Sequence, residues 1–368
     1  MKYIISGGGT GGHIFPAVSI ANALRELDAE AEILFVGALG RMEMQRVPAA
    51  GYEIVGLPVR GLLRPLWKPA NVGVLWDYLR SKQMIKKTIK EFAPQVAVGV
   101  GGYASSATLN AAYEMGIPCL IQEQNSFAGL TNKTLAKKAS KICVAYEGME
   151  RFFPKERIML TGNPVRQNLL NADLTREQAA TEFGLKADVP TILLVGGSLG
   201  ARTLNQSVLT SLDKIASAPV QFIWQTGGYY KESIAKELAK KEKPENLVVT
   251  DFISRMDCAY RLADLVISRA GASSISELCL LGKPSILVPS PNVAEDHQTH
   301  NAMALVQKNA ALLVKDVEAE QRLVELALQT VTDSESLHTL GENAQKMAFR
   351  DSARVIAEEV IKLAKRSL

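Results

Sequence analysis

The chain has 368 residues, of which 47% are hydrophobic and 22% are charged, and its formal net charge is +4. It is too long for one ordinary hydrophobic core and fits two domains of about 150–200 residues each. No apolar run approaches the roughly 18–20 residues of a membrane span, and the start of the chain lacks the apolar core of a signal peptide, about 7–15 residues. The composition therefore indicates a soluble globular protein.

Short apolar runs alternate with helix-length segments along the N-terminal half. Strands are predicted at residues 2–6, 32–36, 53–57, 95–100, 118–122, 141–145 and 157–161, and amphipathic stretches between them include 16–27, 74–92 and 128–138. Apolar strands separated by helices indicate parallel βαβ units with helices on both faces of a sheet.

The C-terminal half repeats this pattern after a break at residues 161–166, where Gly-Asn-Pro ends a strand and suits a hinge. A polar stretch, 167–188, comes next. Further strands are predicted at 191–195, 221–224, 247–250, 265–268, 284–288 and 311–314, with helices at 201–215, 230–240, 273–281 and 298–307.

We therefore predict an α/β protein of two doubly wound, Rossmann-like domains that face one cleft. The N-terminal domain comprises residues 1–163 and the C-terminal domain residues 164–347. The tail, 337–368, is helix-compatible apart from an interruption near 349–352, and we expect its last part, about 348–368, to pack back on the first domain.

The four cysteines argue for a reducing compartment and against a metal centre. Each lies in an apolar segment without CxxC or other metal-ligand spacing; they are Cys119, Cys143, Cys258 and Cys279. This usage is typical of small buried side chains in a reducing environment. We expect the cytoplasm, and no metal or cofactor.

Three glycine-rich loops each follow a predicted strand, at residues 6–13, 99–106 and 195–202. A strand that ends in glycines and opens into a helix brings backbone N–H groups and the positive end of a helix to one point, which favours a phosphate. Three such loops in two halves of the chain indicate a large phosphorylated ligand.

The first loop matches the dinucleotide fingerprint Gly-x-Gly-x-x-Gly at Gly7, Gly9 and Gly12. That fingerprint also needs an acidic residue at the end of the second strand, to hold ribose hydroxyls, and here that strand ends in Gly-Ala. NAD binding is therefore disfavoured, and tight packing explains only some of the glycines. His13 lies where the helix begins and is either a structural histidine or a side chain that faces the ligand.

The third loop places Ser198 and Arg202 at the start of a helix. A hydroxyl and a guanidinium there would supplement the backbone donors around a diphosphate. The loop lacks the Gly-Lys-Ser/Thr of a Walker motif, and an ordinary turn between strand and helix is the alternative interpretation.

Residues 268–277, Ser-Arg-Ala-Gly-Ala-Ser-Ser-Ile-Ser-Glu, form the most specific segment of the chain. Small residues at the start of a helix allow close approach of a ligand, and the carboxylate of Glu277 would accept two hydrogen bonds from a ribose diol. The alternative is helix capping by the serines. In the polar loop 289–301, Gln298 is suited to contact sugar hydroxyls.

A metal site is disfavoured. His297 and His300 can share a helix face, but no third ligand lies nearby, and the chain has no Asp-x-Asp. Metal-dependent nucleotide-sugar enzymes need such a carboxylate cluster to hold a divalent ion on the diphosphate. If the ligand is a nucleotide sugar, we expect helix termini and arginines, rather than a metal ion, to neutralise the negative charge of its departing diphosphate.

Five motifs occur in one order along the chain. They are Gly-Gly-Thr-Gly-Gly-His (8–13), Gln-Glu-Gln-Asn (122–125) followed by Ala-Gly-Leu-Thr-Asn (128–132), Thr-Gly-Asn-Pro-Val-Arg (161–166), Gly-Gly-Ser-x-Gly-Ala-Arg (196–202) and Gly-Ala-x-x-x-Ser-Glu (271–277). Over nearly the whole chain they resemble the MurG family of bacterial cell-wall synthesis. The resemblance implies a GT-B fold and an inverting, metal-independent transfer of GlcNAc from UDP-GlcNAc to the 4-hydroxyl of the muramoyl sugar in lipid I, undecaprenyl-diphosphate-MurNAc-pentapeptide, which forms lipid II.

The resemblance also assigns site residues. The implied contacts of UDP-GlcNAc are Thr10, Gly11, Gly12, Asn125, Arg166, Ser198, Ile253, Ala272, Ser273, Ser274, Ile275, Ser276, Glu277 and Gln298, with the backbone of Ile253 at the uracil edge. The candidate general bases are His13, as first choice, and Glu123. In one departure, the family often has His before Glu-Gln-Asn where this chain has Gln122, which removes one imidazole from the acceptor side.

Residues 60–91 contain eight basic and two acidic side chains, so the rest of the chain has a net charge of −2. Leucines and tryptophans interleave with these basic residues, which suits an anionic membrane surface. With a lipid-linked acceptor, we expect a peripheral protein at the cytoplasmic face of the inner membrane, with other cell-wall enzymes as further candidate partners and no nucleic acid. From residue 75 onward, we expect a helical stripe that lies in the core rather than at a membrane, formed by Tyr78, Leu79, Ile85, Ile89 and Phe92. The alternative for the whole segment is a solvated basic loop followed by a buried helix.

Two other functions remain open at this point. One is another GT-B enzyme, such as a lipid glycosyltransferase or a UDP-GlcNAc 2-epimerase. The epimerase would convert UDP-GlcNAc without any acceptor. The other is a non-catalytic nucleotide-binding scaffold, which UDP release in the presence of lipid I would exclude.

Overall fold

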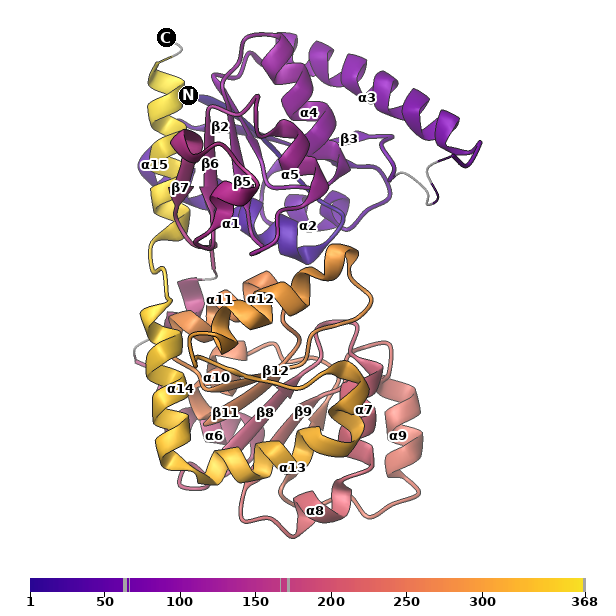
Figure 1. The fold of residues 1–368 in the computed structure, drawn as a ribbon, viewed down its shortest axis with the longest axis vertical. Coiled ribbons are helices and arrows are strands. Elements are labelled where there is room, and N and C mark those ends of the chain that lie inside the picture. The colour runs from indigo at the N-terminus through magenta and orange to yellow at the C-terminus, as the bar shows by residue number, and fades with distance from the viewer. Residues whose placement is uncertain (62–64, 66, 166, 171–172, 367–368) are drawn as a thin grey trace. The chain divides into compact units, whose positions relative to one another are not determined.

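A computed structural model describes the chain except residues 62–64, 66, 166, 171–172 and 367–368, together with the side chains of 167, 168 and 294. It divides into two compact units (Figure 1). Unit 1 comprises Met1–Val165 and Phe349–Leu368, and unit 2 comprises Arg166–Ala348. The predicted boundary after residue 163 lies slightly earlier in the chain.

Unit 1 is built on a sheet of seven parallel strands in the order β3-β2-β1-β4-β5-β6-β7. The strands are β1 (Lys2–Ser6), β2 (Glu32–Ala38), β3 (Glu53–Leu57), β4 (Val96–Gly99), β5 (Cys119–Glu123), β6 (Lys141–Val144) and β7 (Ile158–Leu160). Each lies at a position predicted from the sequence. The order reverses between β1 and β4, which makes the sheet doubly wound.

Helices cover both faces of this sheet. They are α1 (Gly11–Leu27), α2 (Glu43–Ala49), α3 (Asn71–Phe92), α4 (Tyr103–Glu114), α5 (Leu130–Leu135) and α15 (Ser352–Lys365), with two short 3-10 turns at Met149–Arg151 and Lys155–Arg157. Alternate residues of each strand point to opposite faces. Ile5 therefore packs with α1 and α15, whereas its neighbour Ile4 packs with α3, α4 and α5.

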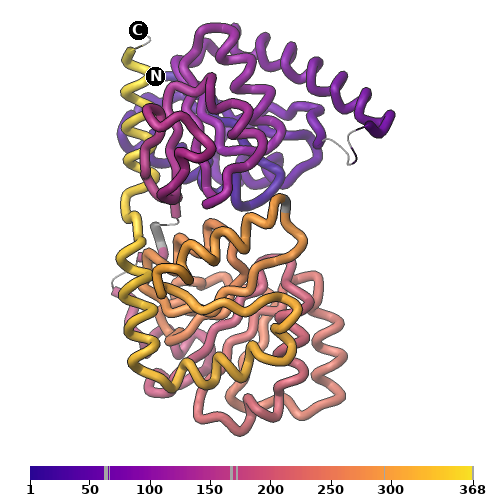
Figure 2. The backbone as a smooth tube through the Cα atoms, in the orientation of Figure 1, coloured from indigo at the N-terminus to yellow at the C-terminus, as the bar shows by residue number. Residues whose placement is uncertain are grey.

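The C-terminal helix belongs to the first core. After unit 2 the chain returns to unit 1, and α15 packs along α1, as Figure 2 lets the reader follow. Its buried residues Ile356 and Val360 join the cluster that contains Ile20 of α1. Gly162 has a φ of +74°, and a Cβ there would lie 2.3 Å from Cβ of Phe349, so the returning chain needs a glycine at this contact.

Unit 2 is built on six parallel strands in the order β10-β9-β8-β11-β12-β13. The strands are β8 (Thr191–Val195), β9 (Gln221–Gln225), β10 (Leu247–Thr250), β11 (Leu265–Ser268), β12 (Ser285–Leu287) and β13 (Leu312–Leu313). The helices are α6 (Arg176–Phe183), α7 (Arg202–Leu209), α8 (Leu212–Ala216), α9 (Lys231–Leu238), α10 (Met256–Leu262), α11 (Ala272–Leu280), α12 (His297–Val306), α13 (Ala319–Thr332) and α14 (Ser334–Lys346); short 3-10 turns lie at Gln167–Leu170, Ala294–Asp296 and Asp316–Glu318. All six strands follow the predicted positions.

One local prediction for unit 2 needs correction, and one polar stretch contains a helix. The helix expected over 201–215 is two helices, α7 and α8, which Thr210 and Ser211 separate. The hydroxyl of Thr210 donates to the backbone oxygen of Gln206 at 3.0 Å. The polar stretch 167–188 contains α6, which begins with a capping box: Thr175 and Gln178 each bond the backbone N–H of the other.

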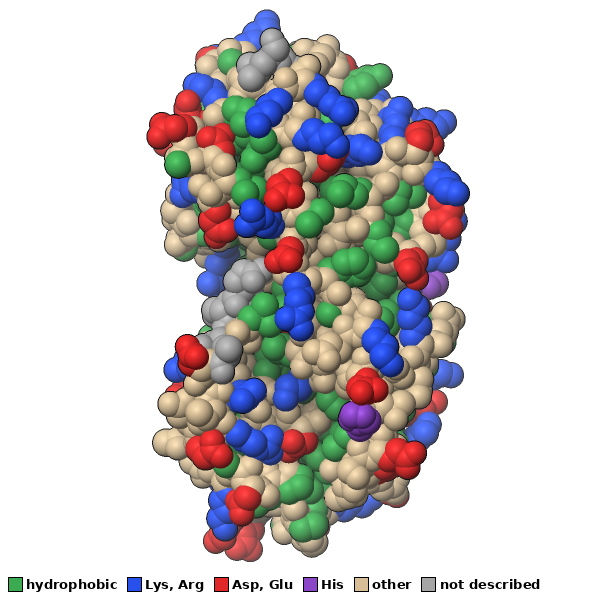
Figure 3. Space-filling model, turned by 90° about the vertical axis from the view of Figure 1, so that its left-hand side faces the viewer, with side chains coloured by type: hydrophobic (Ala, Val, Ile, Leu, Met, Phe, Trp, Pro, Cys, Tyr) green, Lys and Arg blue, Asp and Glu red, His purple; other side chains and the backbone are tan. Residues whose placement is uncertain are grey.

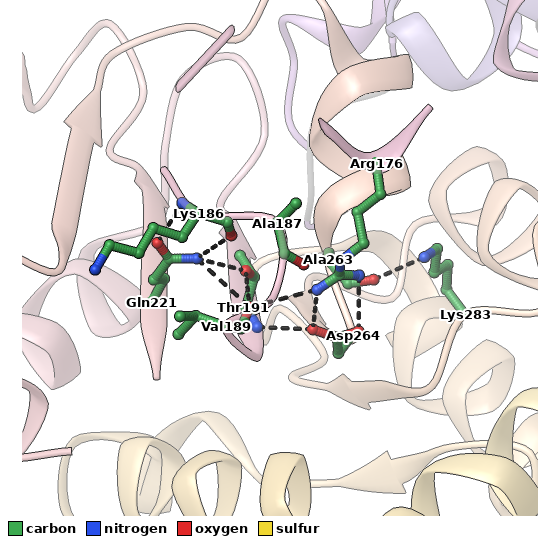
Figure 4. Close-up of polar contacts among 9 residues, drawn as sticks. All are labelled: Arg176, Lys186, Ala187, Val189, Thr191, Gln221, Ala263, Asp264 and Lys283. Atoms are coloured by element: carbon green, nitrogen blue, oxygen red, sulfur yellow. Dashed lines mark hydrogen bonds and ion pairs between the residues drawn. The ribbon is translucent and has the colours of Figure 1, made fainter. Parts of the chain in front are cut away.

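A polar network ties α6 to the amino-terminal edge of this sheet (Figure 4). The guanidinium of Arg176 donates two hydrogen bonds to Asp264, at 2.9 and 2.7 Å, and a third to the backbone oxygen of Ala187 at 2.6 Å. Asp264 also accepts the backbone N–H of Thr191, which begins β8, at 2.8 Å. A bidentate pair held on both sides in this way is among the stronger polar contacts in proteins.

Lys283 lies beside this network and donates from Nζ to the backbone oxygen of Ala263 at 2.7 Å (Figure 4). Burial of the ammonium group lowers the pKa of Lys283 from 10.5 to about 8, although the nearby charge of Asp264 acts in the opposite direction. The folded protein therefore releases this proton at a lower pH than the unfolded chain does.

We expect Lys283 to make the free energy of unfolding rise with pH between about 8 and 10.5, because the unfolded chain binds the extra proton in that window. The unfolding free energy of the wild type minus that of Lys283→Met should increase by roughly 1–3 kcal/mol across this pH window. Urea denaturation at several pH values measures this. The exposed Lys236→Met is the matched control, and a difference that stays constant with pH for Lys283→Met contradicts the prediction.

Candidate functional site

The glycine-rich loops lie at the carboxyl edges of the two sheets, where strand order reverses. In unit 1 the loops after β1 and β4 flank this point, and in unit 2 the loops after β8 and β11 do. Ligands of open α/β sheets bind at such switch points. Within each unit, the fold thus collects the predicted motifs on one edge.

The first two glycine loops pack directly against each other. A Cβ at Gly102, where φ is +87°, would lie 2.7 Å from the backbone oxygen of Gly8. A Cβ at Gly101, where φ is +101°, would lie 2.8 Å from Cε1 of His13. These two glycines are therefore required by the left-handed backbone and by the close approach of the first loop and the His13 ring.

A buried carboxyl group, that of Glu43, binds the backbone of the first glycine-rich loop. Glu43 is fully buried and accepts hydrogen bonds from the backbone N–H of Gly9 at 2.9 Å and of Ala38 at 3.0 Å. Gly8 and Gly37 leave room for it, since a Cβ at either would lie within 2.5 Å of the Glu43 side chain. One N–H that the sequence suggested for a phosphate is thus bound to an internal carboxyl group.

His13 lies in the first turn of α1, after Thr10, Gly11 and Gly12. Its side chain is half-buried, and Nδ1 lies 3.0 Å from Oε1 of Gln124, which follows β5. Thr10 and Gly12 are exposed, whereas Gln124 is 2% exposed. The imidazole is therefore anchored on one side by a buried amide.

Glu123, the second candidate base, is 1% exposed and anchors its own loop. Oε1 accepts the backbone N–H of Asn125 at 3.0 Å, and Oε2 accepts the backbone N–H of Gly129 at 3.0 Å and the amide of Asn132 at 2.9 Å. A carboxyl group with both oxygens held in this way orders the loop after β5, and Asn125, a predicted donor contact, lies on that loop. These contacts favour a structural role for Glu123.

Gln122 is fully buried, and its Nε2 donates to Oδ1 of Asn163 at 2.9 Å. The position at which the family often carries a histidine is therefore an interior position in this protein. The effect of the departure on an acceptor site would be indirect, through the packing of residues 122–125.

In unit 2, Gln225 at the end of β9 joins the third glycine loop to the loop after β10. Its Nε2 donates to the backbone oxygen of Gly197 at 3.0 Å and to that of Asp251 at 3.2 Å. Ser198 is exposed beside the first contact, whereas the side chain of Ile253 is 6% exposed. Any contact of Ile253 with a base would therefore involve its backbone, as the sequence suggested.

The segment 272–277 forms the first turns of α11. The residue before the helix is Gly271, and no side chain caps its N-terminus, so the capping interpretation of the serines is wrong. Glu277 is 6% exposed, and the hydroxyl of Tyr260 on α10 donates to its Oε2 at 3.2 Å. Ile275 is 2% exposed and Ala272 is 8% exposed, while Ser273, Ser274 and Ser276 are partly exposed.

The loop after β12 is held at both ends. Oε1 of Gln298 accepts the backbone N–H of Ser290 at 2.9 Å. Arg269 donates from Nη1 to the oxygen of Val288 at 3.1 Å and to Asp316 at 2.5 Å. Within the described residues, no three His, Cys, Asp or Glu side chains form a group that could hold a metal ion.

Arg166, a predicted donor contact, lies outside the described residues. Sequence reasoning missed Glu43, Gln124, Gln225, Tyr260 and Arg269, all of which position site loops or site side chains. Arg269 and Gln124 lie in segments that the sequence analysis named, 268–277 and 122–125, but their contacts were not predicted. The contacts of Glu43 with Gly9, Gln124 with His13, Gln225 with Gly197 and Tyr260 with Glu277 each join residues 17 or more positions apart, which no local pattern reveals.

Residues 3–144 match the glycosyltransferase family 28 N-terminal domain, and residues 191–356 match the family 28 C-terminal domain. The chain is 63% identical to a UDP-N-acetylglucosamine--N-acetylmuramyl-(pentapeptide) pyrophosphoryl-undecaprenol N-acetylglucosamine transferase of Phocaeicola vulgatus, over 99% of this chain and 96% of that protein. The chain belongs to the MurG family. A relative of the same name from Bacteroides fragilis is 61% identical over 100% of this chain and 97% of its own.

A solved structure of a MurG protein agrees with membership of the MurG family, and a second solved structure shares the fold. The crystal structure of Acinetobacter baumannii MurG aligns with a TM-score of 0.79 at 27% identity, over 98% of this chain and 99% of that one. A UDP-GlcNAc 2-epimerase from Neisseria meningitidis aligns with a TM-score of 0.70 at 14% identity, over 98% and 100% of the two chains, which shows a shared fold alone. The predicted GT-B fold of two Rossmann-like domains is confirmed.

Proposed function

We propose that this protein transfers GlcNAc from UDP-GlcNAc to the 4-hydroxyl of the muramoyl sugar of lipid I, with inversion at the anomeric carbon, and forms lipid II. The observation that carries this proposal is the 63% identity, over almost the full length of both chains, to a transferase named for these substrates. The reaction serves bacterial cell-wall synthesis.

We assign most of the donor contacts to unit 2, whereas the predicted contacts Thr10, Gly11, Gly12 and Asn125 lie in unit 1. The third glycine loop with Ser198, the first turn of α11 and Gln298 all lie at the carboxyl edge of one sheet. The positive end of α11 and its small side chains suit a diphosphate. Glu277, oriented by the hydroxyl of Tyr260, suits the ribose diol, and the backbone of Ile253 suits the uracil edge.

We assign the general base to His13. The supporting observation is the contrast between the two candidates: Glu123 is buried with both oxygens hydrogen-bonded inside its loop, whereas His13 is half-buried beside exposed Thr10 and Gly12. A base takes the proton of the acceptor hydroxyl while helix termini and polar side chains stabilise the departing UDP.

A transfer assay with labelled UDP-GlcNAc and a lipid I analogue, with and without EDTA, tests this function. We expect formation of the disaccharide product only when both substrates are present, at a rate that EDTA does not change. Conversion of UDP-GlcNAc without the acceptor would instead indicate an epimerase. Absence of UDP release with both substrates would indicate a nucleotide-binding scaffold.

Two substitutions should separate catalysis from donor binding. His13→Ala should lower kcat by about 10²-fold or more, because proton transfer is lost, with a KM for UDP-GlcNAc close to that of the wild type. Glu277→Ala should mainly raise that KM, because the ribose loses its partner. Steady-state kinetics at a fixed concentration of lipid I analogue measures both.

Glu123→Gln is informative beside these variants, because it removes the charge but keeps the shape of the loop anchor. If Glu123 is structural, this variant loses stability more than kcat. Unchanged turnover of His13→Ala would overturn the assignment of His13, and an unaltered KM for Glu277→Ala would overturn the ribose contact.

We further propose that α3 docks on an anionic membrane surface, where a lipid-linked acceptor resides. Ile85 and Ile89 of α3 are buried in the core, as expected, but Leu79 is 49% exposed and was wrongly predicted to join them. It continues an exposed apolar stripe with Val72, Leu75 and Trp76, preceded by Trp67. The apolar side chains at 62, 63 and 66 lie outside the described residues.

The charge around this stripe supports the proposal. Basic side chains are concentrated on 60–91, and lysines and arginines beside exposed tryptophans are typical of membrane-surface helices. The face of unit 1 that carries α15 differs, because acidic and basic side chains are interspersed there (Figure 3), as in the pair of Arg354 with Glu358 at 3.1 Å. No helix among the described residues is long and apolar enough to cross a membrane.

Removing the exposed tryptophans should weaken this docking. Trp67 is 84% exposed and Trp76 is 70% exposed, so the double variant Trp67→Ser, Trp76→Ser should fold normally but sediment less with phosphatidylglycerol vesicles. Tyr229→Ser, at an 80% exposed aromatic residue of unit 2, is the matched control and should bind as the wild type does. Equal sedimentation of all three proteins would contradict the docking role of α3.

A further inference from the structure

We propose that Gln124 is a positioning residue that sets the tautomer of His13, with the proton on Nδ1 and the lone pair on Nε2, and that Gln122 and Asn163 lock Gln124 in the orientation this requires. The effect of this tautomer on catalysis rests on the proposed function, in which His13 is the general base. The tautomer itself does not depend on that function.

The orientation of the Gln124 amide follows from the acceptors around it. Nε2 lies 2.9 Å from the backbone oxygen of Val100 and 3.2 Å from that of Gln122, and it also contacts Oε1 of Gln122. Among the described residues, an amide oxygen in this place would face two backbone oxygens, which can only accept, at a position that is 2% exposed. The amide NH₂ group must therefore occupy it, and Oε1 must point to His13.

The orientation of the amide decides the protonation of the imidazole. Oε1 of Gln124 is an acceptor only and lies 3.0 Å from Nδ1 of His13, so Nδ1 must carry the hydrogen. A neutral imidazole has one N–H and one lone pair, which places the lone pair on Nε2. The opposite tautomer would set two lone pairs against each other at a half-buried contact.

Two further amides close the network behind Gln124. Because Oε1 of Gln122 accepts from Gln124, Nε2 of Gln122 is the atom that reaches Oδ1 of Asn163, at 2.9 Å. Nδ2 of Asn163 in turn donates to the backbone oxygen of Gln124 at 2.9 Å. The three residues are 0%, 2% and 3% exposed for Gln122, Gln124 and Asn163. Reversing any one of these three side-chain amides would break hydrogen bonds to its neighbours, so the orientations of the three amides depend on one another.

This arrangement suits a base that is neutral before the reaction and cationic after it. When Nε2 takes a proton, the dipole of the Gln124 oxygen stabilises the resulting imidazolium and keeps the ring in place. An amide adds no net charge, and none of the three amides titrates. The chain thus orients His13 with a neutral group at the position where other enzymes use a carboxylate.

The tautomer is measured directly by long-range ¹H–¹⁵N correlation spectra of protein labelled with ¹⁵N-histidine. Wild-type protein should contain one histidine in the Nδ1–H form, and His13→Ala should abolish that signal, which assigns it. A wild-type His13 signal in the Nε2–H form overturns the proposal.

Gln124→Met keeps the length of the side chain but removes the acceptor. We expect His13 to shift toward the Nε2–H form and kcat to fall roughly 10-fold or more, with the KM for UDP-GlcNAc within about twofold of the wild type because the donor contacts of unit 2 are untouched. Unchanged kcat together with an unchanged His13 signal in this variant contradicts the proposal.

Gln221→Met is the matched control. Gln221 is also a buried amide, 6% exposed, and its Nε2 donates to the backbone oxygen of Lys186 at 2.8 Å, away from the carboxyl edge of its sheet. This variant should lose stability but retain the wild-type kcat and His13 spectrum. If His13→Ala keeps full activity while wild-type His13 has the Nδ1–H form, the general-base role of His13 is overturned and the tautomer assignment stands. If His13→Ala loses activity while wild-type His13 has the Nε2–H form, the tautomer assignment is overturned and the general-base role stands.

Discussion

Loops that follow the strands of a parallel sheet leave backbone N–H and C=O groups without the partners of the sheet ladder, and buried ones must find others. In this protein, buried polar side chains supply those partners. Glu43 binds the backbone of the first glycine loop, Glu123 binds the loop after β5, and Gln225 binds two loops of unit 2. The conformation of these loops at each carboxyl edge therefore depends on contacts with buried polar side chains.

This requirement divides the polar residues at each edge into two groups. The first group is buried, has its hydrogen-bonding capacity used inside the protein, and holds loops in place; Glu123 and Gln124 belong to it. The second group, which includes Thr10 and Ser198, is exposed at the loops so positioned. A residue type alone does not reveal its group: Glu123 and Glu277 are both buried carboxyl residues in motifs, yet one is surrounded by donors of its own loop and the other is oriented by a tyrosine from the neighbouring helix.

The amino-terminal edge of the sheet in unit 2 has a structural role instead. There Arg176, Asp264 and the start of β8 form a network that ties a helix to the sheet, and the buried ammonium group of Lys283 lies against it. Perturbed ionisable groups often mark functional sites, but here the strongly shifted lysine lies at the amino edge, far along each strand from the glycine loops. Its shift is a consequence of burial at a structural contact.

The sequence by itself determined the class of fold, the strand positions and the family, because apolar runs of fixed period, glycines after strands and ordered motifs are local properties of the chain. It also placed the candidate residues at strand ends. Only the tertiary structure decided that Gly8 and Gly37 make room for a carboxyl group, that Gln122 lies in the interior, that Leu79 is exposed, and which way the amide of Gln124 points. Each of these depends on which distant segment packs against a residue, and the chain carries no local pattern for that.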